Sequence, residues 1–429
     1  MGAPSSNPSS KKSIFPYLVV ATGIVCCFGP CAFALSCAGI YFTPVSESLG
    51  VGRGTFALYL TIMLVVTALI LPFLGKLTEQ KDLRLVLSGG VLCIGVPLVC
   101  MSFFNAVWQF YVAGAIMGVG LAEMLVLTVP TLINRWFRKS VGFYIGLCMA
   151  FTGIGGAVFN LLGGYLIGMG PEGWRTGYLV FGVLCLVMAL PFTLLCVRSH
   201  PEDLGLLPVG AKEAAAAGST TAAAAKPVGI PAKKAMRTSA FFILAVFAGL
   251  ANLGMNFYQY LPSYASSLVQ FPDVVAIAAT IASVAMLGQA IGKILIGVIN
   301  DKVNVRAGLF FSMLCGLAGL AIMLCVPSMA WIMLCGGFLF GIFYASGTVL
   351  IPLMTRTIFG TLEYSSIYSR IAMVGSLCGA FAVTFWGVLV DSLGFAVTFG
   401  VVIAVIVLLI VLGVLSLNAA KKFAGEMQG

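Results

Sequence analysis

The sequence GKLTEQKDLR at residues 75–84 returns in related form as GVINDKVNVR at residues 297–306. Both copies hold a glycine, then an acidic residue, then an arginine, at the same spacing. The three pairs share an offset of 222 positions, and they are Gly75 with Gly297, Glu79 with Asp301, and Arg84 with Arg306. Pro130 and Pro352 keep this offset. A shared offset across separate segments predicts two homologous halves.

Long apolar runs surround both copies and form two sets of six. Hydrophobic residues make up 61% of the 429 residues and charged residues only 8%, too few for the surface of a soluble protein. Each run can cross a bilayer, which takes about 20 residues as a helix. The predicted spans are 17–41, 54–75, 85–104, 108–133, 141–168, 176–197, 239–266, 274–299, 307–326, 330–355, 364–390 and 394–417. The sequence therefore predicts an all-α membrane protein with twelve transmembrane helices in two pseudo-symmetric six-helix bundles.

Basic residues predict the orientation of these spans. With the amino terminus in the cytoplasm, all but four of the 23 basic residues lie on the cytoplasmic side. The four exceptions are Arg53 and Arg175, which fall outside, and Lys293 and Arg370, which fall within spans. We therefore expect a multi-pass protein of the plasma membrane with both termini cytoplasmic. The predicted organisation is a cytoplasmic tail (1–15), a six-helix bundle (16–198), a cytoplasmic linker (199–237), a second bundle (238–418) and a second cytoplasmic tail (419–429).

Several classes of function are not expected from the composition. The net charge of +10 is spread over short loops, unlike the clustered charge of a nucleic-acid-binding surface. Most of the thirteen cysteines lie in apolar runs, where a thiol acts as a small hydrophobic group. The single histidine, His200, lies in a polar loop and belongs to no metal-ligand spacing. With neither a phosphate-binding GxxxxGK[ST] loop nor a nucleophile–base pair, we expect no metal, no cofactor and no enzymatic activity.

The repeated loops carry a resemblance to a known family. The pattern G-x-x-x-[D/E]-x-x-x-x-R, between spans two and three and again between eight and nine, resembles the cytoplasmic loop motif of the major facilitator superfamily. The first copy departs from that motif, since Glu79 and Gln80 stand where the family usually has Asp and Arg. Within the superfamily, residues 134–158 and 198–210 resemble the oxalate/formate antiporter and monocarboxylate transporter group. The resemblance implies the major facilitator fold and secondary transport by alternating access.

Lys293 in the eighth span is the leading candidate for a substrate-binding residue. It precedes Asp301 by eight residues, a rise of about 12 Å along a helix. One interpretation is a cation on the wall of a central cavity that binds a substrate anion. The other is a lysine that snorkels to the cytoplasmic interface. The resemblance favours the first, because the carboxylate group usually has arginine four residues before the loop glycine. Gln289, one turn earlier on the same face, is expected to hydrogen-bond the same ligand.

Glu123, near mid-depth in the fourth span, is the candidate for coupling. It is interpreted either as a carboxyl group that carries a coupling proton and meets the substrate, or as a structural partner of a neighbouring helix. The repeat offset sets Glu123 against Ala345, beside Tyr344. We therefore expect Glu123 and Tyr344 at pseudo-symmetric points across one cavity. Tyr344 is interpreted as a hydrogen-bond donor to an anion or as a packing aromatic residue.

Three further polar residues lie in the carboxy-terminal spans. Arg370 is either a second cation for a dicarboxylate or a cytoplasmic gate residue that pairs with Glu363, two helical turns before it. Asn252 and Asn256 share one helical face and are candidates for the wall of a water-filled path.

The loop motifs are expected to form a gate. Gly75 and Gly297 allow close helix approach, and Glu79 and Arg84 belong to the first copy of the motif. Asp301 and Arg306 are expected to pair with helix ends and charges of the opposite half. Such contacts would hold the cytoplasmic side closed in the outward-open state.

These observations favour a secondary active transporter of small organic anions, namely mono- or dicarboxylates. Proton symport and exchange for a counter-anion are both open as driving reactions. The expected partners are the substrate and the lipid bilayer, and the protein is expected to act as a monomer. One alternative is a proton-coupled exporter of amphipathic or cationic compounds, with Glu123 as the cation site. Another is a non-transporting membrane sensor built on a transporter scaffold.

Overall fold

The computed structural model describes residues 14–210 and 228–419, and these form helices joined by short loops. The amino-terminal bundle consists of α1 (Phe15–Cys26), η1 (Cys27–Ser36), η2 (Ala38–Tyr41), α2 (Phe42–Leu49), α3 (Arg53–Gln80), α4 (Leu83–Met101), α5 (Val107–Leu121), η3 (Ala122–Leu127), α6 (Thr128–Trp136), α7 (Val141–Ile167), α8 (Gly173–Pro191) and η4 (Phe192–Cys196). The carboxy-terminal bundle consists of α11 (Ser239–Met255), η7 (Asn256–Tyr260), α12 (Leu261–Ser267), α13 (Pro272–Ala276), α14 (Ala278–Lys302), α15 (Val305–Cys325), α16 (Ala330–Phe359) and α17 (Tyr364–Ala419). The predicted all-α fold with two bundles is confirmed.

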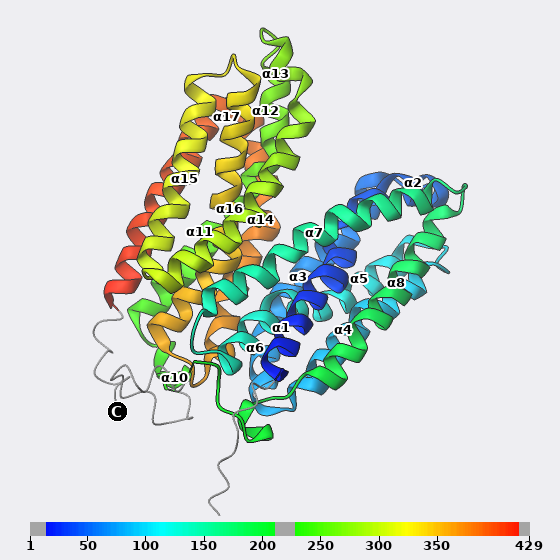
Figure 1. The fold of residues 1–429 in the computed structure, drawn as a ribbon. Coiled ribbons are helices and arrows are strands. Elements are labelled where there is room, and N and C mark those ends of the chain that lie inside the picture. The colour runs from blue at the N-terminus through cyan, green and yellow to red at the C-terminus, as the bar shows by residue number, and fades with distance from the viewer. Residues whose placement is uncertain (1–13, 211–227, 420–429) are drawn as a thin grey trace, which may run out of the picture.

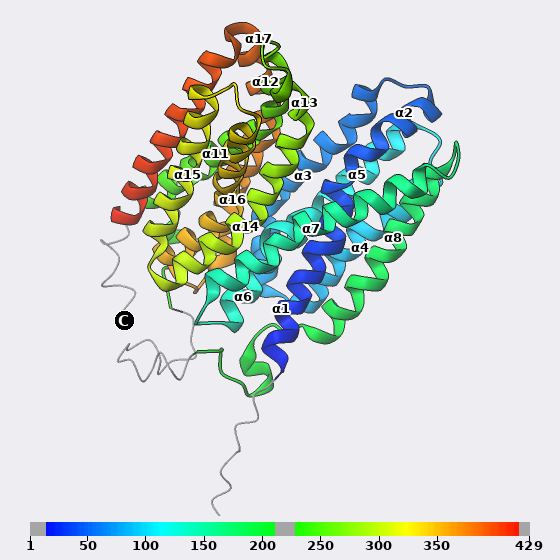
Figure 2. The ribbon, with the colours of Figure 1, turned by 45° about the horizontal axis from the view of Figure 1, so that its top comes forward.

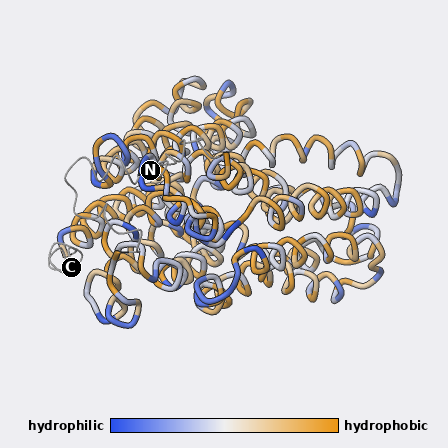
Figure 3. Tube along the Cα trace, turned by 60° about the horizontal axis from the view of Figure 1, so that its bottom comes forward, coloured by the Kyte–Doolittle hydropathy of each residue, from blue (hydrophilic) through white to orange (hydrophobic). Residues whose placement is uncertain are grey.

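Eleven helices in the described ranges are long and apolar enough to cross a membrane. They correspond to eleven of the predicted spans. The remaining predicted span, 364–390, lies in the first part of α17, which is broken at Gly394 by a left-handed φ of 77°. Hydrophobic residues cover most of the helices and hydrophilic residues gather in the loops (Figure 3).

The two bundles meet at one end of the molecule and diverge at the other (Figures 1 and 2). The end where they meet also carries the described parts of the linker, η5 (Pro201–Leu204) and α10 (Ala232–Ala235). We call this end the linker side. The described parts of the predicted linker (199–237), residues 199–210 and 228–237, lie there, and residues 211–227 are outside the described part of the chain.

Each end of the linker is hydrogen-bonded to the bundle beside it. The amide of Val209 donates to the carbonyl oxygen of Trp136 at 2.9 Å, next to the end of α6. The amide of Ile230 donates to the carbonyl oxygen of Phe359 at 3.0 Å, next to the end of α16. Because α6 and α16 are repeat-related, the linker is attached to equivalent points of the two halves.

Glycines bring the two bundles into direct backbone contact. A Cβ atom at Gly146 of α7 would clash with the carbonyl oxygen of Lys293 in α14. One at Gly297 of α14 would clash with the carbonyl oxygen of Gly142 in α7. At the equivalent crossing of α3 and α17, a Cβ atom at Gly75 would lie 2.6 Å from the carbonyl oxygen of Ser365. Side chains at these positions would force the helices apart.

The substitution Gly146→Ala is expected to lower the melting temperature of the purified protein. The added methyl group meets backbone, which cannot rotate away, and such overpacking costs about 1–3 kcal/mol. The matched control is Gly164→Ala on the same helix, where nothing lies within 4 Å of the added Cβ atom. Both variants gain the same helix propensity, so equal melting temperatures would contradict the close contact.

Candidate functional site

The carboxylate of Asp301, at the end of α14, binds the first turn of α7 in the other bundle. It accepts hydrogen bonds from the backbone amides of Gly142 at 2.8 Å and Phe143 at 2.7 Å. The first amides of a helix have no partner within the helix, and the helix dipole favours negative charge at this end. Asp301 therefore ties the two bundles together on the linker side.

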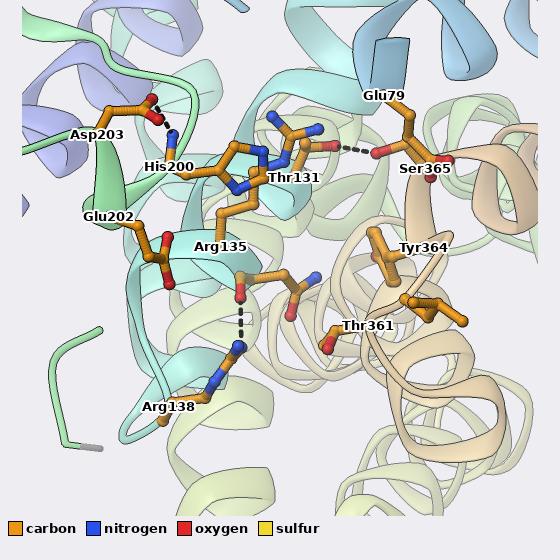
Figure 4. Close-up of a pocket in the computed structure, with 12 residues that line it drawn as sticks. Glu79, Thr131, Arg135, Arg138, His200, Glu202, Asp203, Thr361, Tyr364 and Ser365 are labelled. Carbon is orange, nitrogen blue, oxygen red and sulfur yellow. Dashed lines mark hydrogen bonds between the residues drawn. The ribbon is translucent and has the colours of Figure 1, made fainter. Parts of the chain in front are cut away.

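Glu79, at the end of α3, makes the repeat-related contact with the first turn of α17. It accepts hydrogen bonds from the amide of Ser366 at 2.9 Å and from its hydroxyl group at 3.1 Å. Beside it, the hydroxyl groups of Thr131 and Ser365 hydrogen-bond across the bundles at 3.0 Å (Figure 4). We call the Asp301 and Glu79 contacts the two carboxylate latches. Both lie on the linker side, so this side is closed in the structure.

The arginines of the loop motifs make contacts within their own halves. Arg84 pairs with Asp82 at 2.7 Å, and its guanidinium group lowers the pKa of the Asp82 carboxyl group. Arg306 donates a hydrogen bond to the side-chain oxygen of Asn418, near the end of α17. The expectation that Arg306 pairs with the opposite half is therefore wrong, because Asn418 belongs to the same bundle.

Lys293 is buried where α14 crosses α7, and its side chain is 2% exposed. Its Nζ donates to the carbonyl oxygen of Met149 at 3.2 Å and to the hydroxyl oxygen of Thr152 at 3.1 Å, both in α7. In the described part of the chain, no carboxylate lies within ion-pair distance of Nζ. The ammonium group therefore does not snorkel to the interface. It spans the two bundles as an unpaired buried cation.

Of the other predicted substrate-binding residues in the carboxy-terminal bundle, one lies beside Lys293 and the others lie elsewhere. Gln289 is buried on the same helix one turn from Lys293 and also faces α7, near Gly153. Tyr344 packs edge-on against Tyr258, with ring centroids 5.0 Å apart.

Asn252 and Asn256 donate to carbonyl oxygens of their own helix. Their partners are Ala248 at 2.9 Å and Asn252 at 2.7 Å, each one turn earlier. Asn252 also packs closely against Gly375 of α17. Gln289 is therefore the candidate that the structure brings together with Lys293.

Glu123 is 1% exposed in the π-helical segment η3 and lies inside the amino-terminal bundle. Its Oε2 is 3.3 Å from the hydroxyl oxygen of Thr78 in α3, and its Cβ packs against Gly90 of α4. The Thr78 hydroxyl group also donates to the carbonyl oxygen of Leu74 at 2.7 Å. Since a hydroxyl group has one hydrogen, this geometry suits a protonated Glu123 that donates to Thr78. The other carboxyl oxygen, Oε1, has no partner among the described residues.

Glu123 and Tyr344 therefore lie in different bundles with different neighbours. Glu123 contacts α3 and α4, whereas Tyr344 contacts Tyr258 of η7. The expected pairing of Arg370 with Glu363 is also not what the structure has. Arg370 donates to the carbonyl oxygen of Ser366, and Glu363 accepts from the amide of Ala232 at 2.7 Å.

A cavity of about 540 Å³ lies on the linker side between the bundles (Figure 4). Arg135 reaches it from α6 and donates to the carbonyl oxygens of Thr78 at 2.9 Å and Ser199 at 3.3 Å. His200 enters from the linker, and burial lowers its pKa, so it is neutral at pH 7. Asn134 is 3% exposed and lines the same cavity. Neither its amide nitrogen nor its amide oxygen has a hydrogen-bond partner in the described residues.

The sequence analysis missed Arg135, Thr78 and Thr152 as partners of the site. Arg135 was counted only among the basic residues of the cytoplasmic loops. Threonines in apolar runs have no sequence pattern that marks them as functional. Thr78 sits one residue before Glu79 in the repeated loop, which was the available clue.

The comparisons with known proteins identify the family. The model of the Major Facilitator Superfamily matches residues 24–286 and 272–425, and the chain belongs to this superfamily of membrane transporters. Its fold is similar to that of the proton:xylose symporter XylE bound to 6-bromo-6-deoxy-D-glucose, with a TM-score of 0.65 and 14% identity over 96% of this chain and 95% of that chain. The chain is thus an integral, multi-pass membrane protein of this superfamily.

Two relatives match parts of the sequence. The glucose-6-phosphate exchanger SLC37A2 of Bos taurus is 25% identical over 268 residues, which cover 54% of this chain and 52% of that protein. The multidrug resistance protein MdtG of Rahnella sp. is 30% identical over 152 residues, which cover 34% of this chain and 35% of that protein. The matches span about a third to a half of these relatives. They support the superfamily, and neither relative belongs by name to the carboxylate group.

The substitution Asp301→Asn is expected to open the linker side more often. Hydrogen bonds to a charged group contribute about 1.5–3 kcal/mol each, and asparagine keeps only one acceptor and no charge. We expect a several-fold faster reaction of an introduced Ser365→Cys thiol with an impermeant maleimide, counted above the native cysteines. Ser365 lies at the other crossing, so its labelling reports movement of the whole bundle.

The matched control is Asp82→Asn, which removes a carboxylate that pairs within one bundle. Equal labelling rates for Asp301→Asn and Asp82→Asn would show that the latch does not hold the bundles together.

Proposed function

We propose that the protein moves small organic anions, mono- or dicarboxylates, across the plasma membrane by alternating access. The observation that carries this proposal is the buried, unpaired ammonium group of Lys293 between the bundles. A buried cation is costly without a negative partner, and here its partners are two neutral oxygens. An arriving carboxylate would supply the missing charge. Gln289 would add a hydrogen bond from the same helix.

The position of Lys293 also suggests how binding is linked to movement. Its hydrogen bonds to Met149 and Thr152 join α14 to α7, the crossing that the Asp301 latch closes. A carboxylate that takes the ammonium group from these oxygens weakens one of the two ties at this crossing. With the termini cytoplasmic, the structure corresponds to the outward-open state, and substrate binding favours release of the cytoplasmic side.

Glu123 is proposed to carry a coupling proton. Its hydrogen-bond geometry with Thr78 suits the protonated form, and Arg135 binds the carbonyl oxygen of the same threonine. Loss of the proton would leave a buried carboxylate with one partnerless oxygen, and the positive charge of Arg135 would attract it. The alternative is that transport is driven by exchange for a counter-anion, without a proton. The similarity to a glucose-6-phosphate exchanger supports exchange and also an organic phosphate as the transported anion.

The exporter of amphipathic or cationic compounds is the second candidate, supported by the similarity to MdtG. The burial of Glu123 between α3 and α4 counts against it, since a cationic substrate would need access to that carboxyl group.

Binding of carboxylates is expected to depend on Lys293. In a thermal-shift screen of the purified protein against mono- and dicarboxylates, sugar phosphates and organic cations, we expect a carboxylate to raise the melting temperature. Lys293→Gln should weaken its binding about 10- to 100-fold, because an interaction of about 1.5–3 kcal/mol is lost. Lys302→Gln, which removes an exposed charge from the same helix, should have no effect. A response to organic cations alone would overturn the anion assignment.

Proton coupling is expected to depend on Glu123. If Glu123 carries the proton, uptake by proteoliposomes rises with an inward proton gradient, and Glu123→Gln abolishes that rise. Glu202→Gln, which changes an exposed carboxylate, is the control. If the pH dependence of uptake were unchanged in Glu123→Gln, Glu123 would be excluded as the proton carrier. Exchange for a counter-anion would then be the driving reaction.

A further inference from the structure

A second cavity of about 520 Å³ lies between the bundles, beside the Asp301 latch. Arg138 and Lys139 line it from the loop between α6 and α7, and Arg356 lines it from α16 of the other bundle. Asp301 is the one carboxylate among its described lining residues. The cavity is therefore rich in positive charge, and each bundle contributes an arginine.

The carboxylate of Asp301 is already committed to other donors. It accepts from the backbone amides of Gly142 and Phe143 and from the side-chain amide of Asn300 at 3.2 Å. No arginine lies within ion-pair distance of it in the described ranges. Asp301 thus neutralises the start of α7. In the described ranges no carboxylate lies within ion-pair distance of either arginine, and only longer-range attraction acts on them, from Asp301 on Arg356 and from Glu202 on Arg138.

The two arginines retain free donors. The guanidinium group of Arg138 donates one hydrogen bond within the described residues, to the carbonyl oxygen of Asn134 at 2.9 Å, which holds the side chain in place (Figure 4). Burial lowers the pKa of Arg138, so its charge is poorly compensated by water. Arg356 is half-buried, and its side chain makes no hydrogen bond or ion pair within the described chain. A guanidinium group has five N–H donors, and most of those on Arg138 and Arg356 are unused.

We propose that this cavity binds a small oxyanion between Arg138 and Arg356 and that the bound anion favours the state in which the linker side is closed. Guanidinium groups recognise carboxylate and phosphate oxygens with paired hydrogen bonds. The two arginines come from different bundles, so the complete site exists only while the bundles are in contact here. A ligand that binds one state better than another shifts the population toward that state. An anion on this predicted cytoplasmic side would slow the return to the inward-open state.

This site is separate from Lys293 and does not depend on the proposed substrate. Lys293 bonds to Met149 and Thr152 within the crossing of α7 and α14, and it does not line this cavity. The oxyanion can come from solution, as phosphate does, or from the headgroup of an acidic lipid. Both sources offer the same chemistry to the arginines.

The test measures the melting temperature of the purified protein in sodium phosphate and in sodium chloride at equal pH and ionic strength. We expect phosphate to stabilise the native protein and Arg356→Gln to weaken its binding at least tenfold. Lys81→Gln removes an exposed cation of the amino-terminal bundle and is the charge-matched control. Lys293→Gln removes a tie at the neighbouring crossing and should weaken phosphate binding only several-fold, less than Arg356→Gln does, which separates this site from the substrate site. Stabilisation of Arg356→Gln equal to that of the native protein would overturn the proposal, as would no stabilisation of the native protein by phosphate or by a short-chain phosphatidic acid.

Two further measurements cover the remaining possibilities. If Arg356→Gln does not fold, Arg138→Gln tests the same site from the other bundle and is expected to show the same loss. A short-chain phosphatidic acid is tested in parallel with inorganic phosphate, and stabilisation by the lipid alone would assign the site to a headgroup.

The linkage to the closed state is tested with Glu79→Gln, which weakens the latch at the other crossing and leaves this cavity untouched. Several-fold weaker phosphate binding is expected in this variant. Unchanged affinity would overturn the state dependence.

Discussion

In each bundle, one helix ends with a carboxylate that binds the start of a helix in the other bundle. Asp301 accepts from two backbone amides of α7, and Glu79 accepts from the amide and the hydroxyl group of Ser366 in α17. The Asp301 carboxylate is exposed and the Glu79 carboxylate is partly buried, so each exchanges part of its hydration for hydrogen bonds to the other bundle. When the bundles separate, these hydrogen bonds are replaced by bonds to water. The latches therefore favour two discrete arrangements, closed with protein hydrogen bonds and open with water, as alternating access requires.

The crossing of α7 and α14 combines this gate with the candidate substrate residue. Lys293 lies eight residues before Asp301 on the same helix, and both bond to α7. Glycines on both helices leave no room for side chains between them, so one helix cannot slide along the other to keep one bond while losing the other. In the proposed mechanism, loss of the Lys293 hydrogen bonds to α7 therefore directly weakens the contact that the Asp301 latch also holds.

The sequence predicted the fold well and the site in part, for physical reasons. Hydropathy and the repeat offset report on length and topology, which the bilayer fixes for every span alike. The partner of Asp301 could be predicted only as a helix end of the opposite half, because the amides of Gly142 and Phe143 are backbone groups without a sequence signature. Glu123 was paired with Tyr344 by the repeat offset alone. The repeat offset predicts that two residues lie at the same depth in the membrane. It gives no information on the direction in which each side chain points.

The repeat separates the parts of the protein that move from the parts that bind. The latches, the glycine crossings and the attachment points of the linker recur in both halves. The ionisable residues proposed to bind substrate, proton or anion do not recur: at the offset of 222, Lys293 corresponds to Leu71, Glu123 to Ala345 and Arg356 to Asn134. Symmetric mechanics suit a cycle with two equivalent end states. A substrate or an ion has its own shape and charge and must meet an asymmetric surface. Charges that occur in one half only are therefore the places where the chemistry of this transporter differs from the mechanics it shares with its superfamily.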